Sequence, residues 1–203
     1  MKKKILFIHG FLSSANGTTI THLKNVYKHK YEFIVPELDA NPKTSINKLN
    51  TIIKEEKPNL IVGCSLGGFY ALMCDSGNIP IVVVNPCVNP NEHLKQYVNK
   101  ELKYYNKRND GATTYLMTAE TFETFKEYNY IKDKIKTNVG HLWALLSTND
   151  EVLKDTHIKL FNEVNNETQY KYKFYQLYND FGHRLTHNAM KYLTDLIDNI
   201  MYG

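Results

Sequence analysis

The sequence predicts an α/β fold with a doubly wound, mostly parallel sheet and helices on both faces. Short apolar, β-branched runs alternate along the chain with patterns of helical period. The central runs are apolar throughout, which is typical of parallel strands that are buried on both sides. One run, 59–64, enters a Gly-Cys-Ser-Leu-Gly turn, and an apolar helical pattern follows at once. A chain of 203 residues can bury one ordinary core, so we expect a single domain over 1–203.

The elements follow one another in a regular order. We expect strands within 3–10, 31–38, 59–64, 79–86, 141–153 and 170–178, the last at an edge because its apolar and polar residues alternate. We expect helices within 18–29, 44–56, 67–74 and 188–202. Thr44 or Ser45 is the predicted N-cap of the second helix. Residues 89–136 are polar and rich in tyrosine, and they are too many for an ordinary connection. This segment is therefore predicted to be a helical cap, or lid, inserted into the domain.

Composition favours some classes of protein over others. The net charge of +4 comes almost wholly from lysines scattered among acids, a pattern that disfavours nucleic-acid binding. No stretch approaches the length of a membrane span, and the first apolar run is too short for a signal peptide. Three cysteines without metal-ligand spacing predict a reduced, cytoplasmic setting. We expect no metal and no cofactor, and the sequence does not indicate an oligomeric state.

The turn between strand and helix has the G-x-S-x-G pattern of a nucleophile elbow. In such a turn the backbone of the serine, here Ser65, is strained, and its hydroxyl stands clear above the sheet. Gly63 and Gly67 are needed because a Cβ at either position would clash where strand and helix cross. The N-terminus of the helix lies beneath the serine, where its dipole favours developing negative charge. Ser65 is therefore the predicted nucleophile.

A serine needs a base to remove its proton, and the base needs a carboxylate to orient it. In doubly wound hydrolases the chain order is Ser, Asp or Glu, then His, with the last two after strands. Asp150 follows the fifth predicted strand and His183 follows the sixth, which makes them the predicted acid and base. The rival histidines are His9, His141 and His187, and the rival acids are Glu151 and Asp180.

Backbone N–H groups are expected to form an oxyanion hole for the tetrahedral intermediate. The residue after the nucleophile, Leu66, supplies one, and Phe11 in the loop after the first strand is the candidate for the other. Aromatic residues of the predicted lid are expected to line an acyl-binding surface, with ordinary helix packing as the alternative. These residues are Tyr97, Tyr104, Tyr105, Phe122 and Phe125.

Five stretches carry a resemblance that runs from end to end of the chain: "ILFIHGFLSS", "IVGCSLGGFYA", "VNPCVNP", "LLSTNDEVL" and "FGHRLTH". With them the sequence resembles the α/β-hydrolases and, within that group, the small bacterial YqiA-type esterases of the UPF0227 family. The resemblance implies esterase activity, and we expect the partner to be a small acyl ester or thioester that is cleaved through an acyl-enzyme intermediate. It also implies that Ser65 is the nucleophile, Asp150 the orienting acid and His183 the base.

Three other interpretations are weaker. A zinc hydrolase is suggested by the spacing of His183 and His187, but the glutamate of the zinc motif and a third ligand are missing. Cys64 is a poor candidate nucleophile, because it ends a strand and is expected to be buried. The chain could instead be a hydrolase-like binding or scaffold protein whose Ser, Asp and His are unused.

Overall fold

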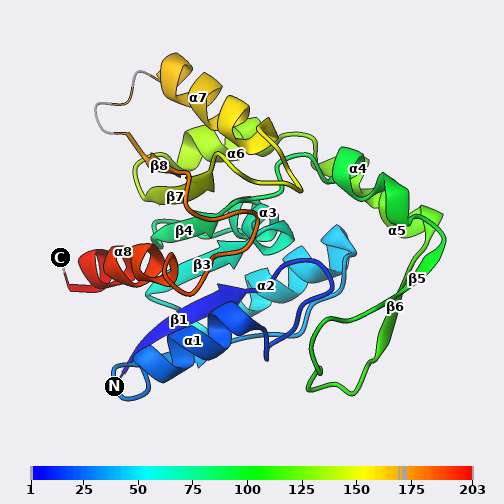
Figure 1. Ribbon diagram of the computed structural model, residues 1–203, viewed down its shortest axis with the longest axis horizontal. Helices are drawn as coiled ribbons and strands as arrows, with labels where there is room; N and C mark the ends of the chain where they lie inside the picture. Colours follow the sequence, from blue (N-terminus) through cyan, green and yellow to red (C-terminus); the bar gives the residue numbers. More distant parts are fainter. Residues whose placement is uncertain (1, 169, 171–172, 203) are drawn as a thin grey trace.

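A six-stranded sheet forms the centre of the protein, in the strand order β2-β1-β3-β4-β7-β8 (Figure 1). The computed structural model describes residues 2–168, 170 and 173–202, so part of the predicted strand 170–178 lies outside the described residues. Every described pair in this sheet is parallel. The strands are β1 (Lys3–Ile8), β2 (Tyr31–Ile34), β3 (Leu60–Cys64), β4 (Ile81–Val84), β7 (Leu142–Ser147) and β8 (Tyr175–Tyr178). The predicted fold class is confirmed, with β8 at an edge as expected.

Helices cover both faces of the sheet, because alternate residues of each central strand point to opposite sides. In β1, Leu6 and Ile8 join one core cluster, whereas Ile5 and Phe7 join the other. The first cluster is completed by α2 (Pro42–Glu56), α3 (Leu66–Met73), α6 (Ile131–Asn138) and α7 (Thr156–Thr168), and the second by α1 (Thr18–Val26) and α8 (Met190–Tyr202). Within the described ranges, no helix combines the length and apolar character that a membrane crossing needs.

Two local features differ from expectation. The N-cap of α2 is Asn41, whose side chain accepts hydrogen bonds from the N–H groups of Lys43 and Thr44. Pro42 then occupies the first turn, where its missing N–H costs nothing, so the helix starts before the predicted caps Thr44 and Ser45. Helix α7 was not predicted, although His157, Phe161 and Val164 are its buried residues and have helical spacing.

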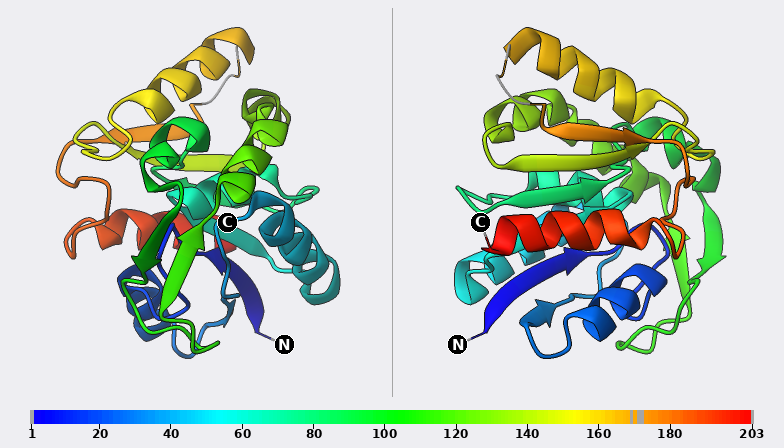
Figure 2. Two further views of the ribbon diagram at one scale, coloured as in Figure 1. Left: turned by 90° about the vertical axis from the view of Figure 1, so that its right-hand side faces the viewer. Right: turned by 60° about the vertical axis from the view of Figure 1, so that its left-hand side comes forward.

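The segment 89–136 leaves the sheet after β4 and stands at the carboxyl ends of the strands (Figures 1 and 2). It contains short helical turns, namely α4 (Pro90–His93), η1 (Lys95–Tyr97), α5 (Ala119–Thr124) and η2 (Phe125–Tyr128). It also contains an unpredicted antiparallel pair, β5 (Lys100–Lys103) with β6 (Thr114–Met117). The segment ends within α6, which packs against α3 and α7 over the sheet. Its hairpin therefore projects from the sheet, while its last residues belong to a covering helix.

Candidate active site

Ser65 lies in the sharp turn between β3 and α3, with φ 54° and ψ −122°. This backbone region is unfavourable for a residue with a side chain, by about 1–3 kcal/mol. A Cβ at Gly63 would overlap Gly67 O and lie 2.9 Å from Ala71 Cβ. A Cβ at Gly67 would overlap Ile8 O and lie 2.5 Å from His9 O. The two glycines thus let strand and helix cross closely enough to hold Ser65 in its strained conformation.

Ser65, His183 and Asp150 come together in one hydrogen-bonded line. Ser65 Oγ is 2.8 Å from His183 Nε2, and His183 Nδ1 is 2.8 Å from Asp150 Oδ2. They are brought in by three separate loops, which follow β3, β8 and β7. The Asp150 side chain is wholly buried, whereas the His183 ring keeps a small exposed edge. The ring of His183 therefore contacts Ser65 and keeps one edge toward solvent.

Asp150 is held as a charged carboxylate. Burial by itself would raise its pKa, but the hydrogen bond from His183 and those from backbone amides outweigh burial and lower it. Asp150 Oδ1 accepts from Leu153 N at 2.7 Å and from Val152 N at 2.9 Å, which leaves Oδ2 for the histidine. One carboxylate oxygen thus fixes the side chain while the other fixes the ring of His183.

The rival acids have other partners. Glu151 accepts a hydrogen bond from the backbone N of His183 at 2.8 Å, so it holds the loop rather than the ring. Asp180 accepts from the Tyr192 hydroxyl at 2.6 Å.

The rival histidines lie elsewhere. His9 is buried and its ring accepts a hydrogen bond from Leu38 N, and His141 precedes β7 at the opposite end of the sheet. His187 makes an edge contact with His22.

A buried asparagine that sequence reasoning missed secures the loop of His183. Asn85, at the end of β4, donates from Nδ2 to the carbonyl oxygens of Gly182 and His183, each at 3.0 Å. Its Oδ1 accepts from Ser147 N at 2.7 Å, which ties the same loop to the end of β7. Asn85 has φ 41°, a conformation that asparagine tolerates better than most residues. Its place in "VNPCVNP" directly after an apolar strand was the available signal.

Phe11 and Leu66, whose N–H groups are the predicted oxyanion donors, follow Gly10 and Ser65 in the chain. Leu66 is the first residue of α3, and the turn of Gly10 and Phe11 lies against Ser65, with a Cβ position at Gly10 3.7 Å from Ser65 Oγ. Within the described chain neither N–H donates a hydrogen bond to another protein group. Neither N–H is thus committed to another acceptor of the described chain.

A narrow pocket of about 260 Å³, its open mouth included, lies beside Leu66, the residue that follows Ser65. It is lined by His9, Gly10, Phe11, Leu12, Leu38, Asp39, Ala40, Leu66, Tyr70, Tyr104 and Tyr115. Sequence reasoning missed Tyr70 and Tyr115. Tyr70 was hidden in the helix pattern, and Tyr115 sits on the unpredicted strand β6.

Of the five aromatic residues expected to line substrate, the structure brings only Tyr104 to the pocket wall. Tyr97 packs on Phe11 with ring centres 5.3 Å apart, and so contacts a residue that lines the pocket. Phe125 is 1% exposed and packs on Phe69 in the core, as the helix-packing alternative expects. Phe122 packs against the same core, whereas Tyr105 is 59% exposed. The predicted lid segment thus contributes some aromatic side chains to the core and one to the pocket wall.

Other reactive groups near the turn are not arranged for chemistry. Burial raises the pKa of the Cys64 thiol to about 12, so this thiol stays protonated at neutral pH. Among the residues that the structure describes, no three His, Cys, Asp or Glu side chains are grouped so as to hold a metal ion.

Several solved structures are similar to this chain over nearly its whole length. Alpha/beta hydrolase domain-containing protein 10 from mouse is similar over 98% of this chain and 89% of its own, with TM-score 0.59 and 17% identity. Est1E from Butyrivibrio proteoclasticus is similar over 99% and 87%, with TM-score 0.65 and 13% identity. A monoacylglycerol lipase from Paleococcus ferrophilus is similar over 97% and 93%, with TM-score 0.62 and 13% identity.

At these identities the solved structures establish a shared α/β-hydrolase fold. The model of the uncharacterised protein family UPF0227 matches residues 4–197, which is nearly the whole chain. The chain therefore belongs to the UPF0227 family and has the α/β-hydrolase fold.

Proposed function

We propose that the protein is a serine hydrolase that cleaves acyl esters or thioesters through an acyl-enzyme intermediate. The observation that carries the proposal is the line from Ser65 Oγ through His183 to Asp150, with 2.8 Å at each step. A hydroxyl, an imidazole and a buried carboxylate at hydrogen-bond distance are the parts that acyl transfer needs. The monoacylglycerol lipase among the proteins of this fold supports the proposal.

In the first half of the reaction, Ser65 Oγ attacks the carbonyl carbon while His183 Nε2 takes the hydroxyl proton. The displaced electron pair of the C=O bond moves onto the carbonyl oxygen, which the N–H groups of Phe11 and Leu66 would bind. When the intermediate collapses, the bond to the leaving oxygen or sulfur breaks. The leaving group keeps that electron pair and takes the proton from His183 Nε2, which leaves an acyl-serine.

Water completes the cycle by the same route. His183 Nε2 takes a proton from a water molecule, whose oxygen attacks the acyl carbon. The second intermediate collapses by breaking the bond to Ser65 Oγ, which recovers its proton from His183. Throughout, Asp150 keeps the ring in the tautomer that leaves Nε2 free and stabilises the imidazolium that forms.

Labelling with a fluorophosphonate probe tests the proposal against a scaffold with an unused site. A working site is expected to label at Ser65, and Ser65→Ala is expected to abolish both labelling and ester hydrolysis, with a loss of about a thousandfold or more. Circular dichroism of the variant checks that the fold survives. Wild-type protein that neither labels nor hydrolyses any member of a panel of acyl esters and thioesters would support the scaffold instead.

A further inference from the structure

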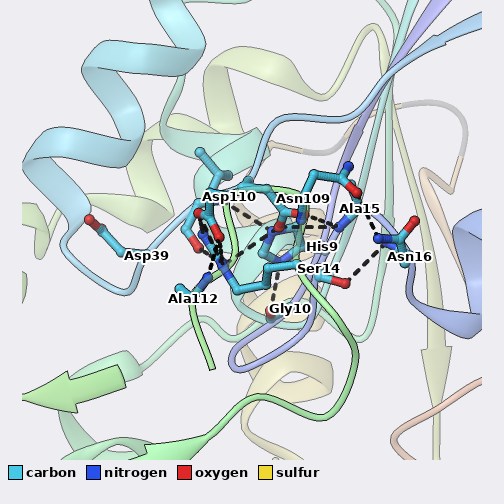
Figure 3. Close-up of polar contacts among 12 residues, drawn as sticks. His9, Gly10, Ser14, Ala15, Asn16, Asp39, Asn109, Asp110 and Ala112 are labelled. Carbon is cyan, nitrogen blue, oxygen red and sulfur yellow. Dashed lines mark hydrogen bonds and ion pairs between the residues drawn. The ribbon is translucent and has the colours of Figure 1, made fainter. Parts of the chain in front are cut away.

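A cluster of polar and charged side chains lies where the segment 89–136, called the insertion below, meets the loop after β1 (Figure 3). At its centre is Arg108, whose side chain is 5% exposed. Its Nε and Nη2 donate to the Asp110 carboxylate at 2.5–3.2 Å, and its Nη1 donates to Leu38 O at 2.9 Å. The guanidinium also stacks on the ring of Tyr104, 4.4 Å from its centre. One side chain thus joins the insertion to the pocket wall.

The loop 9–16, which bears Phe11, does not have a relaxed backbone of its own. Ser13 N donates to Gly10 O at 3.1 Å to close a turn, and within it Leu12 has φ 56°. That left-handed conformation disfavours a leucine and needs support from outside the turn. The nearest external bond is from Tyr105 N to Leu12 O at 2.9 Å, and it comes from the insertion.

Further bonds join the rest of the loop to the same part of the insertion (Figure 3). Ser14 Oγ donates to Lys107 O at 3.0 Å, and Asn16 Nδ2 donates to the same oxygen at 2.9 Å. Asn16 Nδ2 also reaches Asn109 Oδ1 at 2.9 Å. Hydrogen bonds to residues 105–109 therefore hold loop 9–16 in its conformation.

Glu37 links the two segments electrostatically. Its carboxylate accepts from Ala15 N at 3.3 Å and from Asn109 N at 2.9 Å, and lies 3.5 Å from Arg108 Nη1. His9 Nε2 is 3.6 Å from the same carboxylate, but burial lowers the pKa of His9 and favours its neutral form. Arg108 is thus the permanent cation facing both Glu37 and Asp110.

We propose that Arg108 is a positioning residue that holds loop 9–16 against the insertion, so that the N–H of Phe11 keeps its place beside Ser65. This inference rests on the proposed function, in which that N–H binds the developing oxyanion. A buried ion pair by itself is weak evidence for stability, because desolvation offsets the attraction. The planar guanidinium of Arg108 bonds to a carboxylate and a carbonyl while it stacks on an aromatic ring. The single ammonium group of a lysine cannot make these three contacts together.

The test compares Arg108→Ala and Arg108→Lys with wild type in steady-state ester hydrolysis. We expect kcat to fall about tenfold to a hundredfold in both variants. This loss is smaller than the loss caused by removing an oxyanion donor outright, because the Phe11 N–H is displaced and not removed. KM is expected to change little, since the lost interaction acts in the transition state. Added guanidinium ion, at concentrations far below those that denature, is expected to restore part of kcat to Arg108→Ala.

Lys132→Ala is the matched control, because Lys132 also pairs with two acids, Glu163 and Glu167, but on the surface between α6 and α7. Its kcat is expected to equal that of wild type. If Arg108→Ala does not fold, Asp110→Asn takes its place. Asp110 is half exposed, and its loss loosens Arg108 without leaving a cavity, so a fall in kcat of several-fold is expected.

An unchanged kcat in a folded Arg108→Ala, or in Asp110→Asn where the alanine variant does not fold, would overturn the inference. A loss confined to thermal stability, with no response to guanidinium, would overturn it too. Both results leave the proposed function intact if Ser65→Ala is inactive. If wild type itself neither turns over nor labels at Ser65, the proposed function fails and the inference fails with it.

Discussion

Replacing Asp150 with asparagine is the sharpest probe of the proposed site, because the change keeps size and shape. The amide oxygen can still accept from Val152 N and Leu153 N, which now bond to Oδ1 at 2.9 and 2.7 Å. The amide nitrogen then takes the place of Oδ2, 2.8 Å from His183 Nδ1. The fold is expected to survive, since the backbone bonds that hold residue 150 are retained.

The catalytic cost follows from the reversal of one hydrogen bond. An amide nitrogen at that position donates to His183 Nδ1, so the ring proton moves to Nε2. A protonated Nε2 cannot accept the proton of Ser65 Oγ, which lies 2.8 Å away. The same substitution in the best-studied serine protease costs about ten-thousandfold in kcat, which corresponds to about 5.4 kcal/mol in the activation barrier. We expect a loss approaching that size here, because the side chain at 150 is shielded from water.

The assay compares kcat for Asp150→Asn, Glu151→Gln and Asp180→Asn, each checked by circular dichroism. Glu151→Gln keeps an oxygen for His183 N, so we expect a loss below about tenfold. Among the described residues, the Asp180 side chain accepts a hydrogen bond from the Tyr192 hydroxyl, so Asp180→Asn is expected to resemble wild type. If Asp150→Asn is the mildest of the three, the reasoning about the third member of the site is wrong.

Four further predictions follow from the same structure. Gly67→Ala is expected to lower the free energy of unfolding by about 3 kcal/mol or more, because the new Cβ would overlap Ile8 O. Gly140→Ala should change it little, because the nearest atom to the new Cβ is 3.8 Å away. Equal urea midpoints for the two variants would contradict the argument that Gly67 is needed where strand and helix cross. Phe125 is buried in the core, so Phe125→Ala should lower the free energy of unfolding by about 3–5 kcal/mol without changing the preference for acyl-chain length. Tyr104 lines the pocket, so Tyr104→Ala should change that preference in a panel of esters, and the reverse pattern would show that this pocket does not bind the acyl chain. Burial lowers the pKa of His157 to about 4, so between pH 6.5 and 4 the unfolded chain binds a proton that the folded chain does not. The free energy of unfolding should therefore fall by up to about 3 kcal/mol as the pH drops through this range. His157→Gln should make the free energy of unfolding less dependent on pH in denaturation curves, and an unaltered dependence would show that His157 is not its cause. Burial raises the pKa of Cys64 and of Cys87 to about 12, so neither thiol should react with iodoacetamide at pH 8 until the protein is unfolded. Rapid alkylation of either thiol in the native protein would refute this.

By itself, the sequence determined the alternation of strands and helices, the elbow and the chain order of Ser65, Asp150 and His183. These features are local. A buried strand needs only a short apolar run, and an elbow needs glycines two residues on either side of the serine. Helix α7 could also have been predicted from the sequence, because its buried residues have helical spacing. Strands β5 and β6 were harder to predict because each has only four residues, and β5 is largely exposed.

Only the tertiary structure decided which side chains face one another. Glu151 and Asp150 are neighbours in sequence, yet one accepts from the backbone of His183 and the other from its ring. Phe125 and Tyr104 belong to the same aromatic-rich segment, yet one is in the core and the other on the pocket wall. Arg108 meets Leu38, 70 residues away, only after the insertion has folded back over the loop ends. Such partnerships depend on contacts between distant segments, and neither hydrophobic period nor motif spacing carries that information.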